Sequence, residues 1–122
     1  MKITENFTER ELGIKPGLEY KVIINVTLLT CRILQPLRVI LNKPVYITSG
    51  YRTKEDNERV GGVWNSQHLT GQAVDFTCEN LDIAFEKIRK NFVFDQLIYY
   101  RMKKFIHVSY NIQNNRKQII IK

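Results

Sequence analysis

Apolar residues in the first third of the chain recur with the period of one helix face. They follow one another at steps of four and three residues: Val22, Val26, Leu29, Ile33, Leu37 and Ile40. Such a stripe is typical of a helix that packs against a core. Pro36 falls inside the stripe, and proline lacks the amide hydrogen of a regular helix and clashes with the turn before it. The pattern therefore predicts a core helix that is kinked or broken near Gln35.

The other apolar runs are short and rich in β-branched and aromatic residues, which predicts strands. These runs are residues 45–49, 72–77, 92–100, 105–110 and 118–121. A second helical stripe, opened by Asn80 or Asp82, lies after the second run and consists of Leu81, Ala84, Phe85 and Ile88. Short connections, including Asn114-Asn115, favour antiparallel neighbours. We therefore expect an α+β fold with N-terminal helices packed on a mostly antiparallel sheet.

Two further segments, one near the N-terminus and one in the middle of the chain, have patterns that predict their local structure. Thr8 is followed three residues later by Glu11, as in a capping box, which predicts a short helix ended by Gly13. Residues 50–67 contain three glycines and many charges, so we expect loop or short helix there. The chain has no internal repeat and no low-complexity linker, and residues 1–122 are expected to form a single domain.

Composition restricts the classes of protein that fit. With 43% hydrophobic and 25% charged residues, the chain reads as soluble and globular. No apolar run approaches the ~20 residues of a membrane span, and residues 1–6 lack the apolar core of a signal peptide. We therefore expect a protein that is cytoplasmic as synthesised. Cys31 and Cys78 lack a Cys-x-x-Cys spacing and are expected to be buried free thiols, with a disulfide between them left open.

The net charge of +7 is concentrated at the C-terminal end. Residues 101–122 contain six Lys or Arg and no Asp or Glu. Such an end suits an anionic partner, namely nucleic acid, a membrane surface or an acidic cell-wall polymer. A solvated basic edge strand explains the same pattern, so both interpretations stay open.

The chain contains only two histidines, and both lie in segments that favour a metal site. Six residues separate His68 from Asp75, and one of them is Gly71, where the backbone can fold back. Asp75 lies in an otherwise apolar strand and needs a partner, because an unpaired buried charge is costly. Strand alternation places His107 on one face with Phe105 and Ser109. Two histidines and one carboxylate are the ligands of a catalytic zinc that keeps a position open for water.

The order of motifs along nearly the whole chain resembles a known family, the zinc D-Ala-D-Ala carboxypeptidases, in their small single-domain branch. The similar segments are Glu5-Asn6-Phe7-Thr8, Leu34-Gln35-Pro36-Leu37-Arg38, Ile47-Thr48-Ser49-Gly50-Tyr51-Arg52, Asn57, Val60-Gly61-Gly62, residues 68–75, Phe94-Asp95-Gln96-Leu97-Ile98, Ile106-His107-Val108-Ser109-Tyr110 and Asn115-Arg116. The resemblance implies a fold shared with hedgehog-type domains and one zinc ion held by His68, Asp75 and His107. It also implies hydrolysis of peptide bonds next to D-amino acids in peptidoglycan stem peptides. A monomer without nucleic-acid partners is expected.

The resemblance also suggests roles for residues around the metal. Arg52 would stabilise the oxyanion of the tetrahedral intermediate, for which a permanently charged planar donor is suited. Ser66 and Gln67 are candidates for binding the terminal carboxylate of the substrate or for positioning the loop.

One part of the family pattern is missing. Family members typically carry an acidic general base three residues before the last zinc histidine or at the end of the preceding strand. In this chain those positions hold Lys104 and Tyr100, and no acidic residue occurs between Gln96 and His107. Asp95 is the nearest carboxylate upstream and is the candidate general base. The other carboxylates to consider are those that follow Arg52 in a loop, namely Glu55, Asp56 and Glu58.

Three functions therefore remain open at the level of sequence. The first is an active zinc peptidase, of the D-Ala-D-Ala carboxypeptidase type or the phage endolysin type. The second is a catalytically impaired cell-wall binding module that retains zinc. The third, motivated only by the net charge of +7, is a basic nucleic-acid binder. A phage-borne lysin released to the cell wall and a cytoplasmic peptidase acting on precursors fit the sequence equally well.

Overall fold

A computed structural model describes all 122 residues and shows an α+β fold, as the sequence predicts. The helices are α1 (Tyr20–Leu29), the π-helical segment η1 (Thr30–Leu34), α2 (Gln35–Leu41), α3 (Lys54–Arg59), the 3-10 turn η2 (Gln67–Thr70) and α4 (Leu81–Asn91). The strands are β1 (Lys2–Thr4), β2 (Phe7–Thr8), β3 (Val45–Ser49), β4 (Ala73–Cys78), β5 (Gln96–Tyr100), β6 (Phe105–Ser109) and β7 (Gln118–Ile121).

The main sheet has five strands in the order β3-β4-β6-β5-β7, and β1 and β2 form a separate small hairpin. The first three pairings are antiparallel, as expected, whereas β7 runs parallel to β5. The prediction that Asn114-Asn115 joins antiparallel neighbours is therefore wrong. The physical reason is that β6 already pairs with β4 on one side and β5 on the other, so β7 cannot pair with β6 and instead pairs with the free edge of β5.

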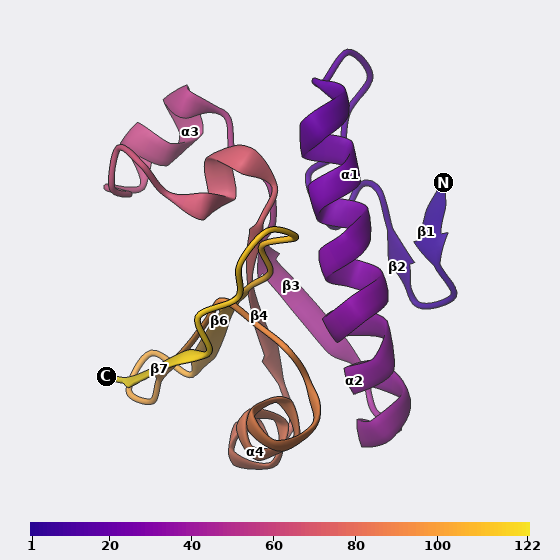
Figure 1. Ribbon diagram of the computed structural model, residues 1–122, viewed down its shortest axis with the longest axis vertical. Helices are drawn as coiled ribbons and strands as arrows, with labels where there is room; N and C mark the ends of the chain where they lie inside the picture. The colour runs from indigo at the N-terminus through magenta and orange to yellow at the C-terminus, as the bar shows by residue number, and fades with distance from the viewer.

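The apolar stripe of the first third forms one unbroken helical run from Tyr20 to Leu41 (Figure 1). Pro36 is accommodated by a widened turn, because the amide of Gln35 donates to the carbonyl of Thr30, five residues back. The helix thus widens at this point instead of breaking. By length and composition alone this run is long and apolar enough to cross a membrane, and the core helix of a globular protein passes the same test.

The buried side of this helix and one face of the sheet enclose the hydrophobic core. Val26, Leu29, Ile33 and Leu37 from the helix belong to one cluster with Val74, Phe76, Leu97, Ile106 and Val108 from the sheet. Helix α4 contacts β4, β5 and β6 as well as α2, and Figure 1 shows it at the opposite end of the sheet from α3. The Asn80 side chain accepts from the Ile83 amide and caps α4, as predicted. The alternate residues of β4, β5 and β6 are left facing away from the core.

Two local predictions are wrong. Thr8 and Glu11 do form the reciprocal hydrogen bonds of a capping box, but residues 9–13 form turns and not a helix. Gly13, at φ +82°, ends the segment after about one turn. A single turn is too short to propagate as a helix. Cys31 is exposed and not buried, because it lies on the outer side of η1; it and the half-buried Cys78 are free thiols.

Candidate metal centre

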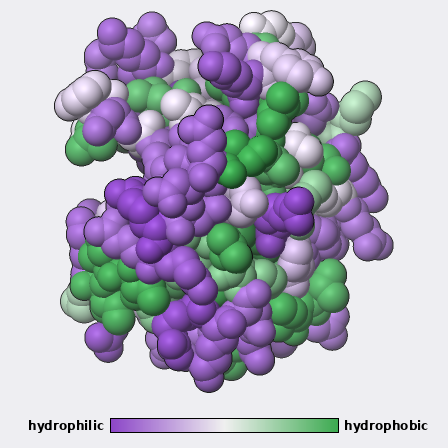
Figure 2. Space-filling view, viewed as in Figure 1, coloured by the Kyte–Doolittle hydropathy of each residue, from purple (hydrophilic) through white to green (hydrophobic).

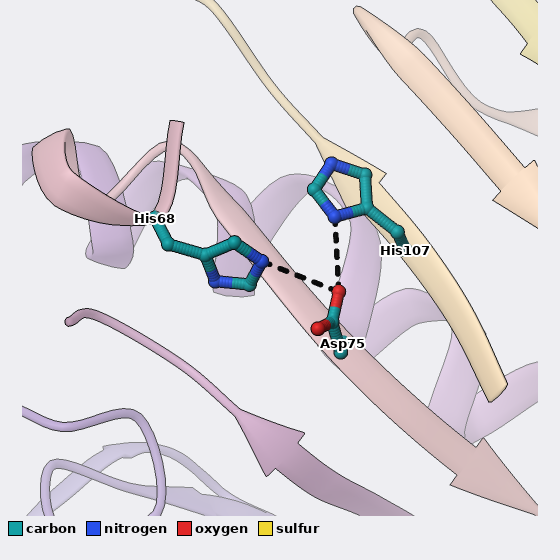
Figure 3. Close-up of side chains that lie close together, drawn as sticks. All are labelled: His68, Asp75 and His107. Atoms are coloured by element: carbon teal, nitrogen blue, oxygen red, sulfur yellow. Dashed lines mark hydrogen bonds and ion pairs between the residues drawn. The ribbon is translucent and has the colours of Figure 1, made fainter. Parts of the chain in front are cut away.

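Three side chains from separate segments meet around one carboxylate oxygen. Asp75 on β4 and His107 on β6 are directly opposed in the antiparallel register, and His107 Nδ1 lies 2.9 Å from Asp75 Oδ1. His68 on η2 brings its Nε2 to 3.3 Å from the same oxygen. Both imidazole rings point at the carboxylate (Figure 3), and one ligand atom from each residue lies within 4.8 Å of the others. The structure therefore brings together the three predicted metal ligands.

The turn around His68 explains why residues 68 and 75 converge. Ser66 Oγ accepts from the His68 amide and caps η2. Gly71 then adopts φ +78° and reverses the chain into β4. A Cβ at this glycine would come within 2.7 Å of the carbonyl oxygen of Val22 on α1. Only glycine satisfies both the left-handed backbone and the close approach, which supports the sequence interpretation of the fold-back.

A backbone contact to Nδ1, the ring nitrogen of His68 that does not face Asp75, fixes the orientation of this ring. Its Nδ1 lies 2.9 Å from the backbone carbonyl oxygen of Gly50. A carbonyl only accepts, so Nδ1 carries the proton and Nε2 keeps its lone pair free. The Arg52 amide also donates to the His68 carbonyl at 3.0 Å. Such contacts behind a ligating imidazole set its tautomer and its direction.

Asp75 is held in its charged form. Asp75 is only 7% exposed, and burial alone would raise the pKa of its carboxyl group. The hydrogen bond with His107 and the close contact with the His68 ring more than offset burial and hold the pKa of Asp75 well below its usual range. Arg52 Nη2 lies 3.4 Å from the second carboxylate oxygen. An ionised carboxylate beside two imidazoles is the donor set that zinc prefers.

Arg52 is anchored beside the candidate ligands through all three of its nitrogens. Nε donates to Ser49 Oγ at 2.9 Å, Nη1 to Asn57 Oδ1 at 3.2 Å and Nη2 to Asp75 Oδ2 at 3.4 Å. Asn57 is itself buried and donates to the Val63 carbonyl. Ser49 was not predicted from the sequence as a contact of Arg52, because its only signal there is a hydroxyl at the end of a strand. Three of the five N–H donors of the guanidinium are used, which leaves two for a bound molecule.

The centre lies in a cleft of about 670 Å³. Asp75 is the only acidic residue that lines the cleft, whereas Arg52, Lys103 and Arg116 line it with positive charge. Figure 2 shows the surface indented at its left edge, between the regions of α3 and of the C-terminal strand, with mainly hydrophilic residues around the indentation. The cleft is therefore polar and cationic, and it is large enough for a short peptide.

Asp95, the candidate general base, lies below the surface and outside the lining of the cleft. It is 2% exposed. Its carboxylate accepts from Arg116 Nε at 2.8 Å, from Arg116 Nη2 at 3.0 Å and from the Arg116 amide at 3.0 Å. These hydrogen bonds outweigh burial and lower the pKa of Asp95 to about 2. A carboxylate held in this way is a weak proton acceptor, and its contacts favour a positioning role.

Asp95 also forms a hydrogen bond with Gln67. Gln67 Nε2 donates to Asp95 Oδ2 at 2.8 Å, which turns the amide oxygen away from the carboxylate. That oxygen is buried and has no hydrogen-bond partner within the protein, although the residue lines the cleft. Ser66, by contrast, uses its hydroxyl to cap η2. Of Ser66 and Gln67, only Gln67 therefore has a side-chain atom without a partner, the hydrogen-bond acceptor Oε1.

The two positions at which the family pattern places an acid have different surroundings. Tyr100 lines the cleft, on the same face as Ile98 and His107. Lys104 does not line it; this residue closes the β5–β6 turn and accepts from Thr77 Oγ1 through its carbonyl. The structure therefore identifies Tyr100 as the residue that stands at the cleft in place of an acid.

Comparison with known families agrees with this geometry. The family model described as Peptidase M15 matches residues 4–109, a span that includes His68, Asp75 and His107. A comparison with curated proteins found no match.

Proposed function

The chain belongs to the peptidase M15 family, a family of metallopeptidases of the zinc D-Ala-D-Ala carboxypeptidase type, and from this premise we propose that it is a zinc peptidase acting on peptidoglycan. The substrate would be a stem peptide, and the bond cut would lie next to a D-amino acid. The observation that carries the proposal is the convergence of His68, Asp75 and His107 on one point in a cleft.

The metal would be held by His68 Nε2, Asp75 Oδ1 and His107 Nδ1, the atoms that already face one another. Zinc bound there would lower the pKa of a coordinated water and polarise a peptide carbonyl. The donor set fits this metal because the imidazole of His68 presents its free lone pair and the carboxylate stays ionised. Three protein ligands leave a position for a water or a substrate oxygen.

Arg52 would stabilise the negative charge that develops on the carbonyl oxygen of the scissile bond. Its anchoring by Ser49 and Asn57 fixes the guanidinium before the substrate arrives, and preorganised donors are the most effective ones in catalysis. Its two remaining N–H groups are available for that oxygen.

Gln67 would position the loop that carries His68, because its amide nitrogen is held by Asp95 and its amide oxygen is buried. Asp95, held by Arg116, keeps the amide in this orientation. The terminal carboxylate of a substrate would therefore find its partners elsewhere than at this oxygen.

A second candidate function follows from Tyr100. The cleft contains no carboxylate besides Asp75, and a positioned acid or base is typically worth ~10²–10⁴ in rate. A zinc-containing module that binds cell-wall peptides without cutting them would need no such group.

The deciding experiment exposes zinc-loaded protein to a panel of peptidoglycan stem peptides and follows products by mass spectrometry. A peptidase releases a defined fragment, and Asp75→Asn abolishes the release because it removes the ionised ligand. Asp82→Asn is the matched control, since this carboxylate lies on α4 and contacts Tyr99. Cleavage that survives in Asp75→Asn would refute the proposal. Binding of the peptides without any cleavage would establish the second candidate.

A further inference from the structure

Three segments meet around the ring of Tyr100. The ring stacks on Phe105, with centroids 4.4 Å apart and planes 16° from parallel. Lys103 Nζ, from the β5–β6 turn, lies 6.0 Å from the ring centroid, and Lys122 Nζ, from the end of β7, lies 5.3 Å from it. Both distances are within the range of a cation–π contact.

The backbone fixes this arrangement. The Lys104 amide donates to the Tyr100 carbonyl and closes the turn that carries Lys103. The Lys122 amide donates to the Tyr99 carbonyl at 2.8 Å, and the Arg101 amide donates to the Lys122 carbonyl at 3.1 Å. The parallel pairing of β7 with β5 is therefore what brings the second lysine to the ring of Tyr100.

Neither lysine has a carboxylate partner. The ion pairs of the chain all involve other residues. The two carboxylates nearest the cleft are already engaged, Asp75 by two imidazoles and Arg52, and Asp95 by Arg116. Two ammonium groups beside one aromatic ring make the electrostatic potential around that ring positive, and an anion bound there would be stabilised.

We propose that Tyr100, Lys103 and Lys122 form a subsite for a carboxylate of the bound peptide, so that the cleft selects acidic peptides over their neutral counterparts. The inference rests on the proposed function in taking a peptide as the ligand. The carboxylate of the ligand would then lie beside Tyr100, one of the two positions at which the family pattern has an acidic residue. Two ammonium groups bind it through charge-assisted hydrogen bonds, and the Tyr100–Phe105 stack packs against the adjoining carbon chain.

The test compares matched ligands that differ by one charge. The first pair is a stem pentapeptide with a free D-Glu α-carboxylate and the same peptide with that group amidated; a third form carries an amidated C-terminus. Binding is measured by calorimetry at low salt, and cleavage is followed on the same samples. An exposed lysine is worth about two- to fivefold in affinity for a carboxylate, so one of the two amidations should weaken binding to wild type by about tenfold.

Three variants assign the preference to the subsite. In Lys103→Gln/Lys122→Gln the acidic and amidated peptides should bind within about twofold of each other. Lys87→Gln, an exposed lysine on α4, should keep the wild-type preference. Tyr100→Glu places a carboxylate of the protein beside the lysines and should reverse the preference in favour of the amidated peptide. Equal binding of acidic and amidated peptides by wild type would overturn the proposal, as would a preference that survives in the double variant.

A second pair of ligands separates this proposal from the proposed function. Tetraglutamate and tetraglutamine are unrelated to the cell wall, and only the first should bind, with its binding lost in the double variant. If tetraglutamate binds in this way and no stem peptide does, the proposed function fails and the carboxylate subsite stands. If wild type binds tetraglutamate no better than tetraglutamine, the subsite is refuted.

Discussion

The contacts of Asp95 predict a specific dependence of stability on pH. Its pKa falls from an ordinary value of 3.8 to about 2 in the folded protein. A carboxyl whose folded pKa is depressed stabilises the protein above its unfolded pKa and loses that contribution as the pH falls from 3.8 towards 2. At about 1.4 kcal/mol per pH unit, the contribution at neutral pH is about 2 kcal/mol. Because Arg116 is 51% exposed, solvent screening makes this an upper value.

Asp95→Asn isolates this contribution, since it removes the charge and keeps the size of the side chain. Urea unfolding at pH 7 should show the variant less stable by about 1–2 kcal/mol. The linkage relation with the two pKa values predicts that this difference shrinks by about 1 kcal/mol at pH 3. Other carboxylates titrate in both proteins alike, so the difference between wild type and variant reports on Asp95 alone.

Kinetics of the same variant distinguish positioning from proton transfer. If Asp95 acts by orienting Gln67, the variant should bind its substrate more weakly and keep most of its kcat. A general base would instead cost ~10²–10⁴ in kcat. A stability difference that is constant from pH 7 to pH 3, together with a collapse of kcat, would refute the reasoning.

Three further predictions concern other parts of the site and the fold. Gly71→Ala should destabilise the protein by about 2 kcal/mol or more, because the new Cβ is strained at φ +78° and meets the carbonyl of Val22; urea unfolding measures it, and an unchanged midpoint would contradict the packing argument. Arg52→Lys should lower kcat of the zinc-loaded protein by about 10²-fold with zinc content retained, since one ammonium cannot replace the fork of donors; wild-type kcat in this variant would remove Arg52 from the mechanism. Asn80→Ala should cost about 1 kcal/mol through the lost cap at the Ile83 amide, with activity per folded molecule unchanged; a loss of activity without a loss of stability would show that α4 influences the site.

The metal ligands could be predicted from the sequence because the features that assemble them are local. Gly71 permits the fold-back between His68 and Asp75, and strand alternation turns His107 towards the same face. A buried carboxylate in an apolar strand requires partners wherever the strand lies. Each of these features acts within its own segment of the chain, whatever the order of strands in the sheet.

The contacts that depend on strand order could not be predicted in this way. Asp95 meets Arg116 across 21 residues, and Tyr100 meets Lys122 across a similar span, only because β7 pairs with the free edge of β5. Short connections alone favoured a hairpin with β6, whose two edges are already occupied. The role of Asp95 and the surroundings of Tyr100 therefore required the three-dimensional structure.

The most direct test of the central claim is the metal content of purified wild type and His68→Ala, determined by elemental analysis after exposure to zinc and extensive dialysis. Circular dichroism on the same samples verifies that both proteins are folded. The account predicts about one zinc per chain in wild type and a large loss in the variant, because His68 Nε2 is one of three converging donors. Well-folded wild type that retains no zinc would contradict the account, and so would a variant that retains the full amount.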